Sequence, residues 1–293
     1  MAAILAVGII TLDIINVVDH YPEEDEELRV IEQRVKPGGN ACNTHTVLAQ
    51  FNHKCYLAAT LTLSNDSQTI LRMLNQAGIN TDYCEIYAYG KVPTSYILMN
   101  QSNGSRTIVH HRDLEELGFG HFKTIPIETF DWLHFEGRNI KQLGKMLKWA
   151  RKQLVDQPIS LEIEKDRPGI DNLFGSADIL IIARAFLNAR GFQSVEAFIE
   201  TYREKIGHAI VYIPWGEKGA FLFEKGVLIE QPAFPPARLV DSLGAGDTFN
   251  AGIIHALVSG QTPQQALKSA CQLAGTKCGI AGLDNLPILM DNH

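Results

Sequence analysis

The chain has few cysteines, and none lies at a spacing typical of metal or redox sites. Five occur in 293 residues, an odd number, and no Cys-x-x-Cys is present. Reduced thiols in a cytoplasmic protein explain this pattern better than a disulfide framework does. The adjacent pair His110 and His111 has no third ligand at metal spacing. A structural zinc site, which needs four convergent ligands, is therefore not expected.

Long apolar runs and an excess of positive charge are also missing. No stretch approaches the roughly 18–20 apolar residues of a membrane-spanning helix. The apolar start of the chain has no basic flank and meets Asp13 too early for a signal peptide. A net charge of −7 argues against a basic footprint for nucleic acid or an anionic membrane. The expected partners are therefore small molecules, with no nucleic acid and no membrane.

Three common catalytic signatures are absent as well. The chain has no GxxxxGK[ST], which argues against a P-loop kinase, and no GxGxxG after its first apolar run, which argues against a dinucleotide enzyme. It has no GxSxG elbow, so Ser–His–Asp hydrolysis is not expected. With 45% hydrophobic and 20% charged residues, the composition is that of an ordinary globular protein with a substantial core.

What the chain does have is an alternation of apolar strand candidates and helical patterns. Helical patterns at 139–153 and 193–206 separate several of the strands. This alternation predicts an α/β fold with a mostly parallel central sheet flanked by helices. The strand candidates lie at 3–9, 131–135, 158–163, 178–183, 208–213 and 220–223.

Two early segments follow a different pattern and predict a small β-sheet inserted into the chain path. One is 14–36, and the other is the pair of β-rich runs 94–99 and 106–109, joined by a loop with Asn103-Gly104. Asn-Gly between such runs is a strong hairpin signal. The expected division is an α/β domain of residues 1–12, 38–92 and 114–293, with a β lid of residues 13–37 and 93–113.

The strongest chemical signal is the stretch from Asp241 to Asn250, with the turn Gly244-Ala245-Gly246-Asp247 at its centre. Apolar residues at 249, 253 and 257 predict a helix that begins at this turn. A helix start with glycines binds anions through its free amides. A carboxylate there is either a favourable first-turn residue or a base for a hydroxyl that attacks phosphorus.

A second glycine turn, Pro37-Gly38-Gly39-Asn40-Ala41-Cys42-Asn43, also precedes a helical pattern. Read locally, Asn40 or Asn43 serves as a helix cap. Amide side chains also suit a polyol, because they both donate and accept hydrogen bonds. Asp13, after the first strand, is either a turn residue or an acceptor for sugar hydroxyls.

Together these turns resemble the signatures of the ribokinase-like (phosphofructokinase-B type) carbohydrate kinases. Within the family, the chain is similar to the animal ketohexokinases, and this similarity runs from about residue 4 to 284. The stretches that carry this narrower similarity are 21–25, 102–109, 134–139, 161–165, 233–236 and 271–279.

The resemblance implies a role for each matching residue. Asp247 is the implied base, the amides of Gly244, Ala245 and Gly246 form the anion hole, and Arg138 approaches the phosphates. The implied sugar contacts are Asp13, Gly39, Asn40, Asn43 and Arg106, with Asp25 reaching the sugar site of a partner in a homodimer formed through the β lid. The implied nucleotide contacts are Arg184, Trp215, Gly216, Glu217, Lys218, Gly219, Phe234, Pro235, Gly244, Gly246, Gly275 and Cys278.

The chain departs from the pattern at two positions. Ser105 stands where ketohexokinases usually have Asn, which affects the expected sugar preference. Arg184 stands where they have Lys, in place of the wider family's Asn-x-x-Glu motif, and a guanidinium can bind phosphate bidentately. No direct metal ligand is expected; Glu164 is expected to approach Mg²⁺ through water, unless it is only a surface charge. K⁺ is a further expectation, because monovalent-cation dependence is common in the family.

The reaction implied is transfer of the γ-phosphoryl group of MgATP to a ketohexose, first of all D-fructose at O1. The same chemistry on ribose, another sugar or a nucleoside is the nearest alternative. A catalytically silent sugar-binding regulator is the alternative from a different class, and the intact Asp247 argues against it.

Overall fold

A computed structural model describes residues 1–287 of the chain. Its centre is a nine-stranded sheet in the order β15-β14-β13-β12-β11-β10-β1-β4-β6. The strands from β6 to β13 run parallel, and β14 and β15 are antiparallel additions at one edge. The bounds are β1 Ala3–Val7, β4 Lys54–Ala58, β6 Ile79–Asn80, β10 Trp132–Glu136, β11 Ile159–Ile163, β12 Ile179–Ile182, β13 Ile210–Pro214, β14 Ala220–Glu224 and β15 Val227–Gln231.

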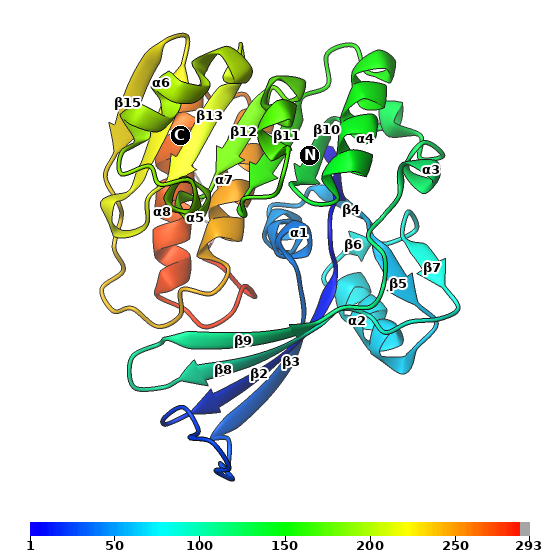
Figure 1. Cartoon of the computed structure of the whole chain (residues 1–293), viewed down its shortest axis with the longest axis vertical. Helices are drawn as coiled ribbons and strands as arrows, with labels where there is room; N and C mark the ends of the chain where they lie inside the picture. The colour runs from blue at the N-terminus through cyan, green and yellow to red at the C-terminus, as the bar shows by residue number, and fades with distance from the viewer. Residues whose placement is uncertain (288–293) are drawn as a thin grey trace.

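Helices cover both faces of this sheet (Figure 1). Alternation along β1 shows the two faces: Ile4 and Ala6 belong to the core with α1, α7 and α8, whereas Leu5 and Val7 belong to the core with α4 and α6. The inner strands are apolar because both faces are buried. The helices are α1 Asn40–Gln50, α2 Asn65–Gln76, α3 Phe119–Phe122, α4 Ile140–Gln153, α5 Arg184–Ala189, α6 Val195–Ile206, α7 Ala245–Val258 and α8 Pro263–Cys278, with 3₁₀ turns η1 Ile127–Thr129, η2 Ile170–Ser176 and η3 Gly216–Lys218.

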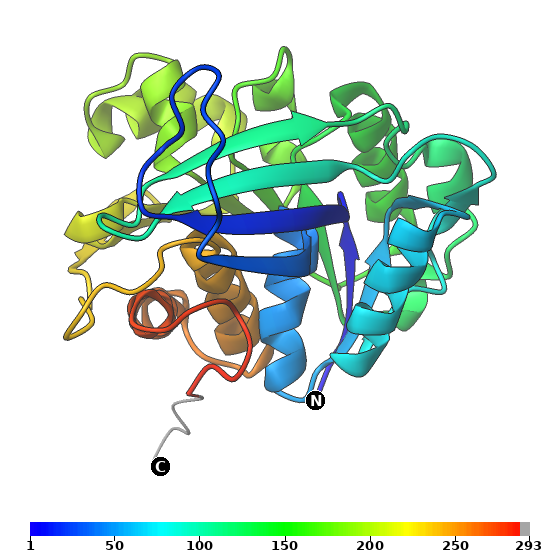
Figure 2. The same ribbon diagram turned by 90° about the horizontal axis from the view of Figure 1, so that it is seen from below.

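A separate four-stranded sheet, in the order β3-β2-β8-β9, lies below the main sheet in Figure 1. Its central pair β2–β8 is parallel and its outer pairs are antiparallel, so the sheet is mixed. Figure 2 shows it spread across the lower side of the molecule, over the ends of α1 and α7. The bounds are β2 Thr11–Val18, β3 Glu32–Gly38, β8 Thr94–Asn100 and β9 Arg106–His111.

The predicted fold class is confirmed: a mostly parallel sheet between helices, with a small inserted sheet. The sequence patterns missed β4, β6, β15, the two-stranded sheet of β5 (Thr60–Thr62) and β7 (Glu85–Tyr87), and helices α2, α3 and α5. These strands have only two to five residues, too few to show a clear period. Within residues 1–287, no helix has both the length and the apolar character needed to cross a membrane.

The connections between the two sheets bring the candidate site residues together. Only three residues separate β1 from β2, so the carboxyl end of β1 leads straight into the four-stranded sheet. In a parallel sheet the carboxyl ends of the strands share one edge. The ends of β10 and β11, the starts of α1 and α7, and the inner side of the four-stranded sheet therefore meet at one place.

Candidate active site

Helix α7 begins at the glycine turn, as the sequence predicts. Gly244 is the residue before the helix and has a left-handed backbone, with φ 79° and ψ 5°. Asp241 stabilises the approach, because its Oδ1 accepts a hydrogen bond from the amide of Leu243 at 2.8 Å. The first-turn amides of a helix have no intrahelical partner and carry the positive end of the dipole; here the Ala245 amide donates a long bond to the carbonyl oxygen of Ser242 at 3.3 Å. The turn can therefore bind an anion.

Asp247 lies in the first turn of α7 and is buried, with 8% of its surface exposed. Its Oδ2 accepts a hydrogen bond from Asn43 Nδ2 of α1 at 2.8 Å, so residues 204 positions apart meet at this site. Burial raises the pKa of Asp247 to about 7; Asn43 opposes the rise, and the charges of Glu136 and Glu164 add to it. A carboxylate with a pKa near neutrality is matched to general-base work.

Two buried glutamates that the sequence patterns missed lie beside Asp247. Glu136 ends β10 and Glu162 lies opposite it in β11, and each is 6% exposed. Burial, followed by the charges of Asp247 and Glu136, raises the pKa of Glu162 well above its usual value. An acidic residue at or next to the carboxyl end of a mostly apolar strand was the available signal for both.

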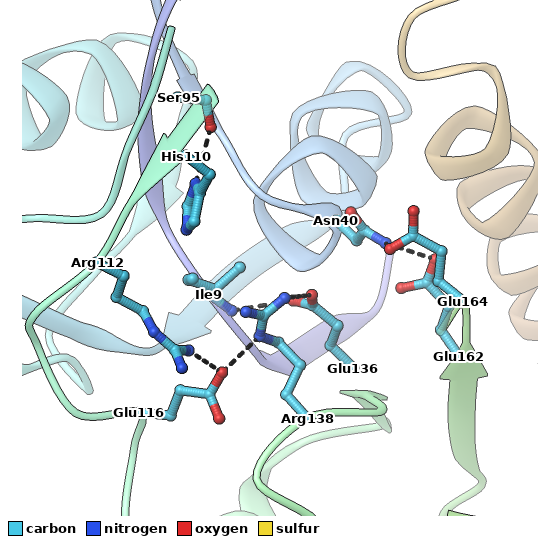
Figure 3. A network of polar contacts seen from close by, with 10 residues as sticks. All are labelled: Ile9, Asn40, Ser95, His110, Arg112, Glu116, Glu136, Arg138, Glu162 and Glu164. Atoms are coloured by element: carbon cyan, nitrogen blue, oxygen red, sulfur yellow. Dashed lines mark hydrogen bonds and ion pairs between the residues drawn. The ribbon is translucent and has the colours of Figure 1, made fainter. Parts of the chain in front are cut away.

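Arg138 neutralises part of this cluster. Its Nη1 donates to Glu136 Oε1 at 3.1 Å and its Nε donates to Glu116 Oε1 at 2.8 Å (Figure 3). Arg112 pairs with the same Glu116. Glu136 also accepts the amide of Ile9 at 3.0 Å through Oε2. Arg138 therefore lies close to the end of β10, where two carboxylates engage its guanidinium; its approach to the phosphates stays a prediction.

Helix α1 begins at the second glycine turn. Gly39 has φ 99°, and a Cβ there would lie 2.3 Å from the carbonyl oxygen of Ile9, so only glycine fits. Asn40 follows and does not cap the helix through its side chain. Its Nδ2 donates to Glu162 Oε1 at 3.0 Å and to Glu164 Oε2 at 3.3 Å (Figure 3). Glu164 is thus half-buried and bonded to Asn40, and its approach to Mg²⁺ through water stays a prediction.

The four-stranded sheet contributes Asp13 and Arg106 to the same region. Thr11 Oγ1 donates to Asp13 Oδ1 at 2.6 Å, and burial raises the pKa of Asp13. Arg106 Nη1 reaches Ser242 Oγ at 3.5 Å, next to the turn that starts α7. Ser105 bonds instead to the Tyr21 hydroxyl at 2.9 Å. Asp25 lies apart, exposed in the loop between β2 and β3, which projects away from the nine-stranded sheet (Figure 1).

A cavity of about 510 Å³ lies between the four-stranded sheet, α1, α2 and the turn before α7. Asp13, Asn43 and Gly244 line it, together with Asp241 and Lys36. Predicted sugar-binding residues from β2 and α1 and a predicted anion-hole residue therefore face one cavity, which is large enough for a monosaccharide.

The predicted nucleotide residues gather on the side of β13–β15 and α8. The Arg184 guanidinium lies 5.1 Å from the centre of the Trp215 ring, a cation–π geometry. A Cβ on Gly275 would lie 1.9 Å from the carbonyl oxygen of Phe234, so α8 packs directly on that loop. Gly219, with φ 102°, is equally confined by the carbonyl oxygen of Gln231. The remaining predicted contacts lie in the same segments: Gly216 and Glu217 with Lys218 in η3, Pro235 after Phe234, and Cys278 at the end of α8.

The carboxyl groups fit a divalent cation. Glu162 Oε2 is buried without a hydrogen-bond partner in the part of the chain that the structure describes. Oxygen ligands suit Mg²⁺, which keeps several waters and binds through few carboxylates plus substrate phosphates. Residues 1–287 contain no cluster of three or more His, Cys, Asp or Glu side chains arranged to hold a metal.

Comparison with known proteins shows the class of this protein, which is that of the carbohydrate kinases. The pfkB family of carbohydrate kinases matches residues 1–288, and the chain belongs to this family. The chain is 38% identical to mouse (Mus musculus) ketohexokinase over 97% of this chain and 98% of that protein. It is 25% identical to an Arabidopsis thaliana ribokinase over 95% of this chain and 76% of that protein.

The structural neighbours include ribokinases. A putative ribokinase from Agrobacterium tumefaciens superposes with a TM-score of 0.85 and 19% identity, over 98% of this chain and 94% of that chain. Ribokinase from Thermotoga maritima gives a TM-score of 0.78 and 20% identity, over 97% and 95%. The superpositions confirm the predicted fold. The family match and the mouse relative confirm the predicted family and show that the protein is an enzyme, a carbohydrate kinase whose family implies ATP and a divalent metal.

Proposed function

We propose that this enzyme transfers the γ-phosphoryl group of ATP to a ketohexose, with D-fructose as the leading acceptor and O1 as the attacking oxygen. The observation that carries the proposal is the buried Asp247, held by Asn43 in the first turn of α7 beside a cavity lined by Asp13 and Asn43. The mouse relative at 38% identity is a ketohexokinase, which favours fructose over ribose.

Asp247 acts as the base. The attacking hydroxyl loses its proton to the carboxylate as its oxygen bonds to phosphorus and the bond from phosphorus to the ADP oxygen breaks. The amides of Gly244, Ala245 and Gly246 stabilise negative charge on the transferred group, because they are fixed before the reaction starts. Asp13, Gly39, Asn40, Asn43 and Arg106 orient the sugar, which turns binding into a rate advantage.

Mg²⁺ supplies charge neutralisation at the phosphates when it is bound with ATP. Glu164, with Glu162 beside it, would hold it through water, since Asn40 bonds both carboxyl groups at the end of β11. Arg138 and Arg184 add positive charge along the phosphate chain, and residues 215–219, 234–235, 275 and 278 enclose the base and ribose. K⁺ remains a prediction, tested by replacing KCl with NaCl at constant ionic strength.

A panel of acceptors tests the substrate. ADP release is measured with saturating MgATP and D-fructose, D-ribose, other ketohexoses and a nucleoside. We expect fructose to give the highest kcat/KM and fructose 1-phosphate as the product. Fructose that turns over no faster than ribose would exclude the ketohexokinase assignment but leave sugar-kinase activity in place. A chain that binds sugar but turns over none of them would be the silent regulator.

Residues 13–37 and 93–113 are proposed to act as a lid over the sugar and as the clasp of a homodimer. All six residues of β9 are exposed, including Ile108 at 48% and Val109 at 64%. Contact between two such sheets would cover these side chains and bring Asp25 of one copy toward the other's sugar site. Light scattering of the wild type and of Val109→Lys tests this, with a dimer expected only for the wild type. A cytoplasmic location is consistent with the five unpaired cysteines.

A further inference from the structure

Lys277 is a lysine whose side chain is completely buried. It lies in the last turn of α8 and is 0% exposed, the only buried lysine within residues 1–287. Its Nζ donates to the carbonyl oxygen of Asp241 at 2.7 Å and lies 2.9 Å from Asp241 Oδ2. Removing an ammonium group from water is unfavourable unless it is paired and hydrogen-bonded. The buried Lys277–Asp241 pair meets both conditions, and its surroundings indicate its role.

The carboxylate and the amide of Asp241 bond to three segments: the residues just before Gly244, the loop after α8 and the end of α8. Its Oδ1 accepts the amide of Leu243 at 2.8 Å, and its Oδ2 accepts the amide of Gly282 at 2.9 Å. Its own amide donates to the carbonyl oxygen of Cys278 at 3.2 Å. The residues just before Gly244 are thus fixed both to the end of α8 and to the loop that follows α8.

The start of α7 depends on this arrangement. Asp241 lies three residues before Gly244, and Gly244 lies three residues before Asp247. The same loop after α8 packs against the turn through Leu283, whose Cδ2 is 2.9 Å from where a Cβ on Gly244 would lie. A displacement of Asp241 therefore moves the first-turn amides and the Asp247 carboxylate together. Errors of about 1 Å in the position of catalytic groups can cost about a hundredfold in rate.

We propose that Lys277 is a positioning residue for phosphoryl transfer, whose fixed positive charge holds Asp241 and, through it, the anion-binding turn and Asp247. The proposal rests on the function proposed for residues 244–247. Lys277 does not line the cavity that Asp13 and Asn43 share, so it acts through Asp241 and not on the acceptor. Its loss should lower kcat more than it changes KM for the sugar.

The test compares Lys277→Ala with Lys268→Ala, a matched change on the same helix at an exposed position. We expect kcat to fall at least tenfold in Lys277→Ala, with KM for the fastest acceptor of the panel changed less than threefold. Methylammonium should enter the vacated space and restore kcat at least threefold, whereas tetramethylammonium at the same ionic strength should not. A kcat equal to that of Lys268→Ala, or a loss that methylammonium does not reverse, would overturn the proposal.

Two further measurements keep the test decisive. Amide hydrogen exchange of residues 241–247 should be faster in Lys277→Ala than in Lys268→Ala, and this readout does not require turnover. Unchanged exchange would refute the role of Lys277 even if the kinase assignment holds, and faster exchange would support it even if the acceptor assignment fails. If Lys277→Ala does not fold, Lys277→Met combined with Asp241→Asn removes both buried charges. That variant should fold with kcat still at least tenfold low, and full activity would contradict positioning.

Discussion

Replacing the Asp247 carboxyl group by an amide should move activity and stability in opposite directions. Asp247→Asn keeps the size of the side chain and an oxygen for the Asn43 hydrogen bond of 2.8 Å. It removes the proton acceptor. General-base catalysis contributes about 10²–10⁴-fold, so kcat should fall by that factor, equivalent to about 3–5 kcal/mol. KM for the sugar should change little.

The effect on stability follows from the pKa. Burial raises the pKa of Asp247 from 3.8 to about 7. Because the folded pKa lies above the unfolded one, this group reduces stability as pH rises from about 4 to about 7, and the cost then stays constant. About three pKa units correspond to about 4 kcal/mol, an upper limit because neighbouring carboxyl groups share the effect. At pH 8, Asp247→Asn should therefore raise the free energy of unfolding by about 1–4 kcal/mol.

The assays are ADP release for kcat and urea unfolding at pH 5 and pH 8 for stability. The exposed Asp156→Asn is the matched control and should change neither quantity. A kcat within tenfold of the wild type would refute the assignment of Asp247 as base. A variant less stable than the wild type at pH 8 would show that the buried carboxylate is favourable where it lies, which contradicts the electrostatic reasoning.

Three further predictions concern the surroundings of the site. Gly39→Ala should lower the free energy of unfolding in urea by about 2–4 kcal/mol, because the new Cβ would lie 2.3 Å from the Ile9 carbonyl oxygen. The control Gly78→Ala, at φ 75° with open space around it, should lower it by only about 1 kcal/mol. Equal losses in the two variants would refute the steric argument. Arg138→Met leaves Glu136 buried without its cation and should cost about 3–5 kcal/mol, whereas Arg151→Met, which breaks an exposed pair with Asp178, should cost under about 1 kcal/mol. Burial lowers the pKa of His53 to about 4 and of His134 to about 3, below their unfolded values, so the stability that they contribute should fall as pH drops below about 6.5. Asp247 contributes with the opposite sign over this range, so the measurement uses Asp247→Asn, whose melting temperature should fall between pH 7 and pH 5; an unchanged value would contradict this.

The sequence alone determined the local parts of this protein. The two glycine turns predict where α1 and α7 begin, because backbone geometry and amide exposure at a helix start depend on a few consecutive residues. The apolar strands and the Asn-Gly hairpin predict the α/β body and the inserted sheet for the same reason. The family resemblance added roles that the residues by themselves left open.

Only the tertiary structure decided which distant residues share the site. Glu136 and Glu162 face Asp247 because β10 and β11 are neighbours in the sheet and end at the same edge, and no local pattern specifies strand order. The same holds for Arg138, which pairs with Glu116 and Glu136, and for Lys277, which lies against Asp241 although 36 residues separate them. The effect of a buried charge depends on the groups next to it, and those groups are brought together only by the packing of the whole chain.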